Sequence, residues 1–338
     1  MSAAETSPRE LQREILRGVS RSFYISVRLL PKQLREPVAL GYLLARATDT
    51  IADTASISWN LRAEQLHTLA AAIQGDETAA AQVADLVSAF APLQTNRSER
   101  ALVHVLPQCL AWLNRTHHRD DIRAVLATIN RGQLLDLERF GSASHIVALA
   151  NENELLEYMW LVAGCVGEFW TSLCFANIDN FCDRPREEML ELAKQYGSGL
   201  QLINILRDAG SDLGQGRCYF PQTEIEAAGI FPSQLPESPL AFGRIFSKWL
   251  EAAEHGVDAG LEYSLAINNR RVRAATVLPA LIGARTLALL RAAGVAALHE
   301  KVKIPRREVR GIVGGVAITL ADRRSLERMF RKLSGRGD

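Results

Sequence analysis

The chain has 338 residues, of which 48% are hydrophobic and 23% charged, so we expect a globular protein of one large or two ordinary domains. Its formal net charge of +1 gives no overall field for nucleic acid, so we expect no nucleic-acid partner and a small molecule held locally. The five cysteines show no disulfide or zinc spacing, so we expect reduced thiols. The N-terminus is unlike a signal peptide and the apolar runs are short, which predicts a cytoplasmic protein without a transmembrane segment. Peripheral membrane contact and oligomeric state are left open.

Helical periodicity dominates the sequence, and strand-like alternation with tight hairpin turns is absent. Proline and glycine residues mark the breaks between the helices. The predicted helices cover residues 8–18, 20–29, 33–54, 59–74, 77–90, 97–115, 119–139, 151–177, 185–213, 236–264, 270–297, 305–314 and 318–334. No low-complexity linker divides the chain, so residues 1–338 are predicted to form a single all-α domain.

The first candidate binding residues lie near a predicted helix start. Ser20, Arg21 and Ser22 place hydroxyls and a guanidinium where free backbone N–H groups already favour phosphate. An N-cap serine and a solvated arginine explain the same residues equally well.

A pair of acidic residues follows in the predicted helix 33–54. Asp49 and Asp53 are four residues apart and therefore share one helix face, with Arg46 about one turn earlier. The neighbouring residues are mostly apolar, and unpaired charges are costly in such surroundings. We therefore expect a cation against this pair.

Small residues gather in the predicted helix 151–177. Ala163, Gly164 and Gly167 would let another group approach the helix closely, and tight helix packing is about as good an explanation as a substrate channel. Tyr158, one turn before Val162, is a candidate for proton transfer in such a channel.

A second acidic pair lies in the predicted helix 185–213. Asp208 and Asp212 repeat the four-residue spacing, and Asn204 extends their stripe by one turn. Arg207 and Arg217 flank the pair closely enough to bind diphosphate oxygens, although each could instead neutralise a neighbouring carboxylate.

The repetition of the DxxxD spacing carries the functional inference. One such pair is common on solvated helices, but two pairs, each beside an arginine and in apolar surroundings, predict a site for Mg²⁺ and a diphosphate. Mn²⁺ is an alternative ion. There is no P-loop, GxSxG elbow or GxGxxG after a strand, so nucleotide triphosphatase, hydrolase and Rossmann functions lack support.

At these residues the chain resembles the squalene/phytoene synthase family. The matching pieces are Ser20–Phe23, Arg46–Asp53, Tyr158–Gly167 and Asn204–Pro221, which are spread over most of the chain. The resemblance implies an isoprenoid synthase helical fold around a central cavity. It also implies that both aspartate pairs bind Mg²⁺ and the diphosphates of two allylic substrates, while apolar side chains exclude water.

Together with the residues above, this resemblance completes the assignment of the site. The expected catalytic residues are Tyr42, Arg46, Tyr158, Arg207 and Arg217; the substrate-binding residues are Ser20, Arg21, Ser22, Phe23, Val162, Ala163, Gly167, Gln201 and Asn204; the metal ligands are Asp49, Asp53, Asp208 and Asp212.

Several features resemble the squalene synthase branch of the family. They are Tyr42 four residues before Arg46, the segment 278–287, and Val302-Lys303-Ile304, which resembles a segment implicated in NADPH use. The resemblance then implies that two farnesyl diphosphates condense through presqualene diphosphate and that NADPH, held by Lys303 and Arg306, reduces the product to squalene. Pro305 departs from the family pattern at a basic position. Phytoene, dehydrosqualene and hydroxysqualene synthases, and a non-catalytic assembly subunit of the same fold, remain alternatives.

Overall fold

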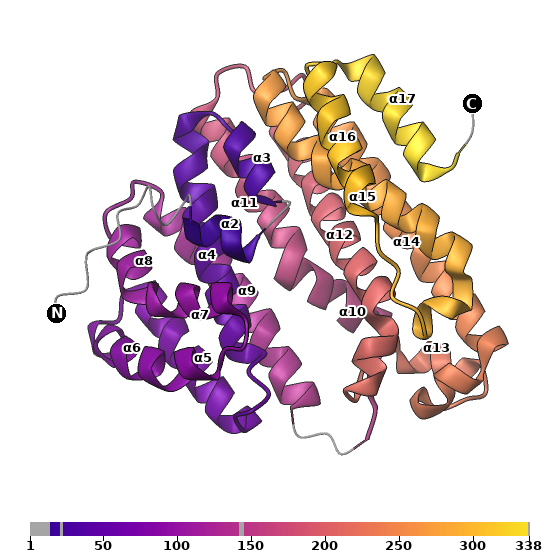
Figure 1. The fold of residues 1–338 in the computed structure, drawn as a ribbon, viewed down its shortest axis with the longest axis horizontal. Coiled ribbons are helices and arrows are strands. Elements are labelled where there is room, and N and C mark those ends of the chain that lie inside the picture. The colour runs from indigo at the N-terminus through magenta and orange to yellow at the C-terminus, as the bar shows by residue number, and fades with distance from the viewer. Residues whose placement is uncertain (1–13, 21–22, 142–144, 337–338) are drawn as a thin grey trace. The chain divides into compact units, whose positions relative to one another are not determined.

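A computed structural model describes residues 14–20, 23–141 and 145–336 (Figure 1). Its helices group into two compact units, Met1–Ser142 and Ala143–Asp338. The all-α class is confirmed in both units, whereas the single domain and the central cavity stay predictions.

The first unit is built from helices alone in its described part. They are α2 (Leu16–Val19), α3 (Phe23–Leu29), α4 (Lys32–Ala52), α5 (Trp59–Gln74), α6 (Glu77–Phe90), the short 3₁₀ turn η2 (Ala91–Leu93), α7 (Arg97–His104), α8 (Leu106–Leu113) and α9 (Arg119–Phe140). Helices α4, α5 and α9 pack against one another, with Ala52, Leu66 and Leu137 in a common apolar cluster. Burial of these faces against each other holds the end of α4 in place.

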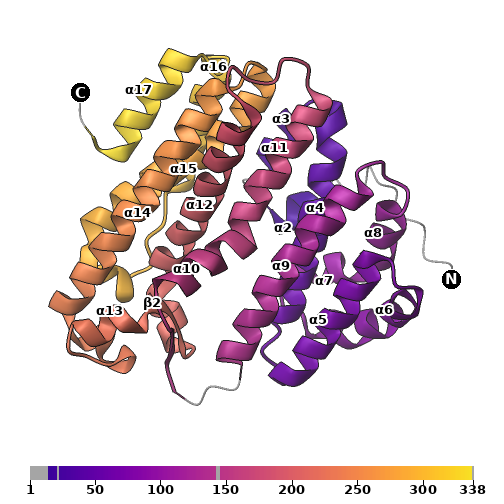
Figure 2. The ribbon, with the colours of Figure 1, turned by 180° about the vertical axis from the view of Figure 1, so that it is seen from behind.

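The second unit carries the longest helices. Its elements are β1 (Val147–Leu149), α10 (Glu152–Met159), the π-helical turn η3 (Trp160–Gly164), α11 (Cys165–Asn177), α12 (Arg186–Gly214), β2 (Arg217–Pro221), α13 (Gln222–Ala227), η4 (Pro232–Glu237), α14 (Pro239–Ala266), α15 (Arg270–Ala293), η5 (Gly294–Leu298), α16 (Arg306–Ile318) and α17 (Arg323–Ser334). Helices α12, α14 and α15 pack side by side, as both views show (Figures 1 and 2).

Glycines allow α12 to pack closely against its neighbours. A Cβ on Gly199 would lie 2.7 Å from the Cα of Gly256 in α14, and one on Gly167 in α11 would lie 2.1 Å from the Ala193 carbonyl oxygen. Real side chains do not fit at such distances, so both contacts need a residue without a Cβ. The small residues around 163–167 therefore have a packing role, which was one of the two explanations that the sequence left open.

Two short strands are present that the sequence pattern does not predict. β1 and β2 form a two-stranded parallel sheet in which Val147 pairs with Arg217 and Ala148 with Cys218, with an irregularity before Leu149. β1 spans only three residues, and β2 buries four residues in succession, so neither strand shows the alternation by which a half-buried strand is recognised.

Most helix positions agree with the sequence prediction, and the exceptions have local causes. The predicted helix 97–115 is broken at Val105, because Pro107 in the first turn of α8 has no N–H to continue α7. The predicted helix 151–177 contains the π-helical turn η3. The last helix begins at Arg323 rather than at residue 318, because Leu320 and Ala321 have positive φ angles.

Two helical segments are long and apolar enough to cross a membrane, Glu152–Asn177 and Arg270–Leu298. The sequence predicts none, because the uninterrupted apolar runs are short. This is weak evidence for a span, since the core helix of a folded protein passes the same test and 39% and 44% of the two windows are buried.

Candidate active site

The first acidic pair lies at the C-terminal end of α4. Asp49 is in the last turn, and Asp53 directly follows the helix and donates its N–H to the Asp49 carbonyl at 2.9 Å. Arg62 of α5 caps the same end by donating to the Ala52 carbonyl at 2.7 Å. The two aspartates are therefore one turn apart, as predicted, on a helix end that is fixed from outside.

Arg46 connects this pair to a third carboxylate. Its Nη1 lies 2.5 Å from Asp49 Oδ2, and its Nη2 lies 2.5 Å from Oε1 of Glu99 in the first turn of α7. Its buried Nε has no hydrogen-bond partner among the described residues. Glu99 escaped the sequence analysis, since it is 53 residues away and no local pattern links it to Arg46.

The surroundings of Asp49 raise its pKa to about 7. Burial is the largest cause and the nearby Asp53 carboxylate the next, while Arg46 acts in the opposite direction. The charged form of this half-buried carboxylate is therefore unfavourable, and a cation in addition to Arg46 would stabilise it.

Tyr42 lies one turn before Arg46 and is held by the segment that precedes α4. Its ring stacks on Phe23 with the centroids 4.6 Å apart, and its hydroxyl donates to the Val19 carbonyl at 3.4 Å. Burial raises the pKa of Tyr42, against the lowering effects of a hydrogen bond with Ser20 and of the Arg46 charge. The structure thus brings Ser20, Phe23, Tyr42 and Arg46 together, whereas Arg21 and Ser22 lie outside the described residues.

The second acidic pair lies near the C-terminal end of α12. Asp208 and Asp212 are on the polar side of this helix, whose opposite side is buried. Arg207 donates through Nε to Asp208 Oδ1 at 3.0 Å, and its Nη2 contacts Oδ2 of the same carboxylate. One turn earlier, the exposed Asn204 donates to Gln201 Oε1 at 3.3 Å.

Arg217 is placed beside this pair by β2. It lines a small recess together with Asp212, and the apolar side chains of Ile205, Ala209, Leu213 and Phe220 complete the wall. The recess is too narrow for a water molecule. Because β2 pairs with β1, the chain turns back after α12, and Arg217 lies close to the acidic pair.

Tyr158 in α10 faces β2. Its ring stacks on Tyr219 with the centroids 5.0 Å apart, and the two hydroxyls are 3.5 Å from each other. Val162 and Ala163 are in the π-helical turn that follows, a distortion often found at functional sites. Tyr219 is a site residue that sequence reasoning missed, although it belongs to the Asn204–Pro221 stretch.

The predicted cofactor residues lie apart from both pairs in the chain. Lys303 is exposed in the extended segment before α16, and Arg306 is the exposed first residue of that helix. Neither makes an ion pair within the described residues. Pro305 caps α16 as a proline can, because no intrahelical N–H is needed there.

The donors of the two pairs fit Mg²⁺. Asp49 and Asp212 lie in the last turns of their helices, and neither turn contains a basic residue. A helix C-terminus carries partial negative charge, so a carboxylate there gains stability from a bound cation. No group of three His, Cys, Asp or Glu side chains in the described ranges could hold a metal by itself. Mg²⁺ usually binds one or two protein carboxylates together with substrate phosphates, and each aspartate pair supplies two such carboxylates.

Comparison with known proteins identifies the family of this chain. The squalene/phytoene synthase family matches residues 16–308. A bifunctional lycopene cyclase/phytoene synthase from Neurospora crassa is 29% identical over 259 residues, which cover 71% of this chain and 40% of the relative. A squalene synthase from Candida albicans is 27% identical over 226 residues, 64% of this chain and 47% of the relative. The match thus spans less than half the length of each relative.

The solved structures show the fold. The structure of TcSQS with a bound ligand superposes with a TM-score of 0.76 at 20% identity, covering 97% of this chain and 90% of that one. The expected isoprenoid synthase helical fold is therefore confirmed. Because the family match extends over most of the described residues, the chain belongs to the squalene/phytoene synthase family.

Proposed function

We propose that this protein is a Mg²⁺-dependent prenyltransferase that joins two prenyl diphosphates head to head. The observation that carries the proposal is the position of both acidic pairs near helix C-termini, where the partial negative charge of the helix end favours a bound cation, within a chain of this family. The protein itself places one arginine against each pair: Arg46 contacts Asp49, and Arg207 contacts Asp208.

The aspartates would hold the metal and the arginines the diphosphate. Asp49, Asp53, Asp208 and Asp212 are the proposed ligands of Mg²⁺, which when bound neutralises the charge that develops on a departing diphosphate. Arg46, Arg207 and Arg217 would bind the remaining phosphate oxygens through charge-assisted hydrogen bonds. Such preorganised charges are usually the largest contribution to catalysis.

The residues beside the acidic pairs would protect and deprotonate the organic part of the substrate. Phe23, Val162 and Ala163 are proposed to exclude water from the allylic cation, whose positive charge an aromatic face also stabilises. Tyr158 is the proposed group for proton transfer, because its hydroxyl meets that of Tyr219 and the pair could pass a proton between them. Gln201 and Asn204 are proposed to orient the substrate.

We further propose farnesyl diphosphate as the substrate and squalene as the product, with NADPH as the hydride donor. Lys303 and Arg306 support this, because they are exposed and unpaired cations in the described residues and could bind cofactor phosphates as point charges. The alternative is a phytoene, dehydrosqualene or hydroxysqualene synthase without a reductive step, which Pro305 favours. The relatives include both phytoene and squalene synthases.

The test of the core proposal is diphosphate release from farnesyl diphosphate with and without Mg²⁺. We expect release to require the metal, and Asp208→Asn to abolish it while the circular dichroism spectrum and melting temperature stay close to wild type. Asp179→Asn is the matched control, because Asp179 is an exposed aspartate in a loop of the same unit. Wild-type release by Asp208→Asn at limiting Mg²⁺ would contradict the proposal, and absence of release by the wild type would favour a non-catalytic assembly subunit.

A further inference from the structure

The charge of this chain is unevenly distributed. Residues 301–336 contain eleven Lys and Arg but only three Asp and Glu, a net charge of +8, whereas the whole chain carries +1. The remaining residues therefore carry a net charge of −7. A strong asymmetry of this kind indicates a local surface for an anionic partner.

The structure concentrates this charge on one side of α17. Its apolar side is buried through Leu326 and Phe330, and Met329 packs against Gly315 of α16. Four exposed residues spaced over two turns form its solvent side, which we call the basic face: Arg324, Arg328, Arg331 and Lys332. None of the four has an acidic partner within the part of the chain that the structure describes.

Two large apolar side chains are exposed directly before this helix. Ile318, the last residue of α16, is 84% exposed, and Leu320 in the turn is 64% exposed. We call these two residues the apolar tip. Single exposed aliphatic side chains are ordinary on protein surfaces, but this pair lies directly before a helix with a basic face, and the two features together suit contact with an apolar phase that carries negative charge.

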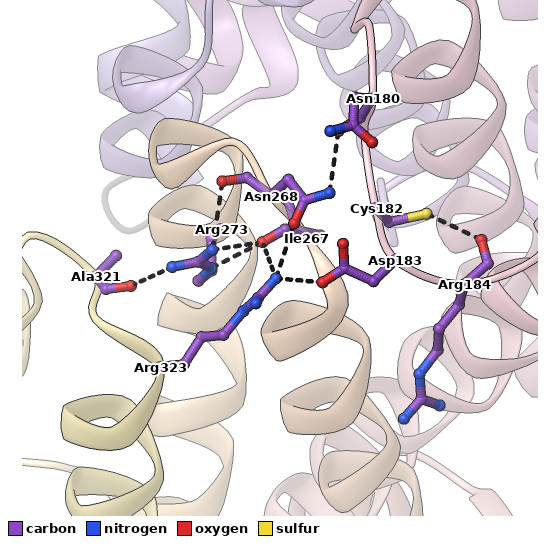
Figure 3. Close-up of polar contacts among 9 residues, drawn as sticks. All are labelled: Asn180, Cys182, Asp183, Arg184, Ile267, Asn268, Arg273, Ala321 and Arg323. Atoms are coloured by element: carbon purple, nitrogen blue, oxygen red, sulfur yellow. Dashed lines mark hydrogen bonds and ion pairs between the residues drawn. The ribbon is translucent and has the colours of Figure 1, made fainter.

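The turn that presents the apolar tip is clamped from the interior (Figure 3). Leu320 and Ala321 have φ angles of 51° and 54°, a left-handed conformation that is uncommon for residues with a Cβ. Buried Arg273 donates to the Ala321 carbonyl at 2.9 Å and to the Ile267 carbonyl at 2.7 Å. The turn is therefore held in a fixed conformation in which Ala321 is buried and Leu320 points to solvent.

A second arginine fixes the start of α17 in the same cluster. Arg323 Nη2 contacts Asp183 Oδ2 at 2.7 Å and Asn268 Oδ1 at 2.9 Å (Figure 3). These contacts tie the first residue of the helix to the α11–α12 connection through Asp183 and to the α14–α15 connection through Asn268. Since the helix begins at a fixed point, the basic face and the apolar tip keep a constant position relative to each other.

We propose that the corner between α16 and α17 docks onto an anionic lipid surface, with the basic face against the phosphate headgroups and the apolar tip inserted between them. Reversible attachment to membranes commonly combines a polybasic surface with an apolar insertion, and both components are present here. A nucleic acid would explain the basic face but not the exposed aliphatic pair, because single-strand binders stack bases on aromatic rings and Phe330 is buried.

The proposal is tested by co-sedimentation of the full chain with lipid vesicles. We expect binding to vesicles containing about a third phosphatidylglycerol and not to pure phosphatidylcholine, and release as salt rises from about 0.1 M to about 0.5 M. Each basic residue near an anionic surface contributes about fivefold in affinity. Replacing all four residues of the basic face with Gln should therefore weaken binding by roughly 600-fold, nearly three orders of magnitude.

Two further variants separate the components. Ile318→Ser combined with Leu320→Ser should weaken binding by about tenfold, because it removes the insertion and leaves the charge intact. The control replaces four exposed basic residues elsewhere with Gln and should bind like wild type: Lys32, Arg115, Arg119 and Arg244. Melting temperatures of all variants verify the fold.

Three results would overturn the proposal. In the first, the wild type and the basic-face variant bind vesicles equally. In the second, the wild type binds charged and uncharged vesicles equally. In the third, the protein binds a DNA duplex with the same salt dependence, and the Ile318 and Leu320 changes have no effect. The vesicle assay needs no substrate, so its outcome is independent of whether the chain releases diphosphate.

Discussion

At the scale of single residues, the pKa of Asp49 makes a prediction about stability. An acid that holds its proton more tightly when folded loses folding free energy as pH rises from its ordinary pKa of 3.8 to the folded value of about 7. Asp49→Asn removes this loss. We therefore expect the melting temperature of the metal-free variant to rise relative to wild type between about pH 4 and about pH 7, and the difference to be constant above that.

Thermal unfolding in the presence of a chelator measures this difference across the pH range. Asp179→Asn is the control for replacing an aspartate by asparagine, since that side chain is exposed in a loop. With Mg²⁺ present, the wild type should regain stability most strongly above about pH 7, where the proton no longer competes with the metal. A difference between Asp49→Asn and wild type that does not vary with pH would show that the carboxylate is not perturbed.

Arg217 tests the assignment of diphosphate contacts. Removing one charge-assisted hydrogen bond costs roughly 1.5–3 kcal/mol, so Arg217→Gln should lower kcat/KM for farnesyl diphosphate by about one to two orders of magnitude. Arg244→Gln, which changes an exposed arginine in α14, should leave kcat/KM at the wild-type value. If Arg217→Gln has no effect on kcat/KM, the arginine only balances the charge of Asp212.

At the scale of elements, the sequence predicted the two site helices within two residues. The ranges 33–54 and 185–213 correspond to Lys32–Ala52 and Arg186–Gly214. Both helices have long apolar faces and begin after a proline, and these are the local signals by which a helix is recognised. The aspartate pairs were predictable for the same reason, because i,i+4 geometry follows from the helix alone.

Partners from distant segments could not be predicted in this way. Glu99 meets Arg46 across two helices, and Tyr219 meets Tyr158 through the β1–β2 pairing. Both contacts depend on tertiary packing, and the strand that carries Tyr219 buries four residues in succession, so it shows no alternation. The sequence therefore revealed the residues that carry chemistry on each helix but not the residues that position them.

The packing between α11 and α12 leads to a prediction about Gly167. A methyl group there would meet the Ala193 carbonyl at 2.1 Å, so Gly167→Ala must displace one helix and should destabilise the protein by about 1–3 kcal/mol. In Gly243→Ala the new methyl meets only Val295 at 3.4 Å, and the helix should gain up to about 1 kcal/mol. Chemical denaturation measures both. Wild-type stability with weakened substrate binding in Gly167→Ala would instead support a substrate channel.

At the scale of the whole molecule, the acidic pairs belong to different compact units, so the proposed reaction requires both halves of the chain. A reaction of this kind makes a hydrocarbon from water-soluble diphosphates. The proposed lipid-facing corner at α16 and α17 would keep the protein at the surface into which such a product can partition.

The proposed reductive step also concerns the whole molecule, and Lys303 makes it testable. A cation formed after the second diphosphate departs can take a hydride, take up water or lose a proton, so these outcomes compete. With NADPH we expect squalene, and without it presqualene diphosphate, alcohols or dehydrosqualene. Lys303→Ala should raise the KM for NADPH and leave the first condensation unchanged, because it would touch only the cofactor.

The matched control is Lys301→Ala, which removes an equally exposed lysine from the same segment. It should leave the KM for NADPH unchanged, so that a difference between the two variants reports a specific contact rather than the loss of one charge. Product analysis by gas chromatography distinguishes the hydrocarbons from the alcohols. The same product mixture with and without NADPH would exclude squalene synthase, and its main component would then identify the chain as a dehydrosqualene or a hydroxysqualene synthase.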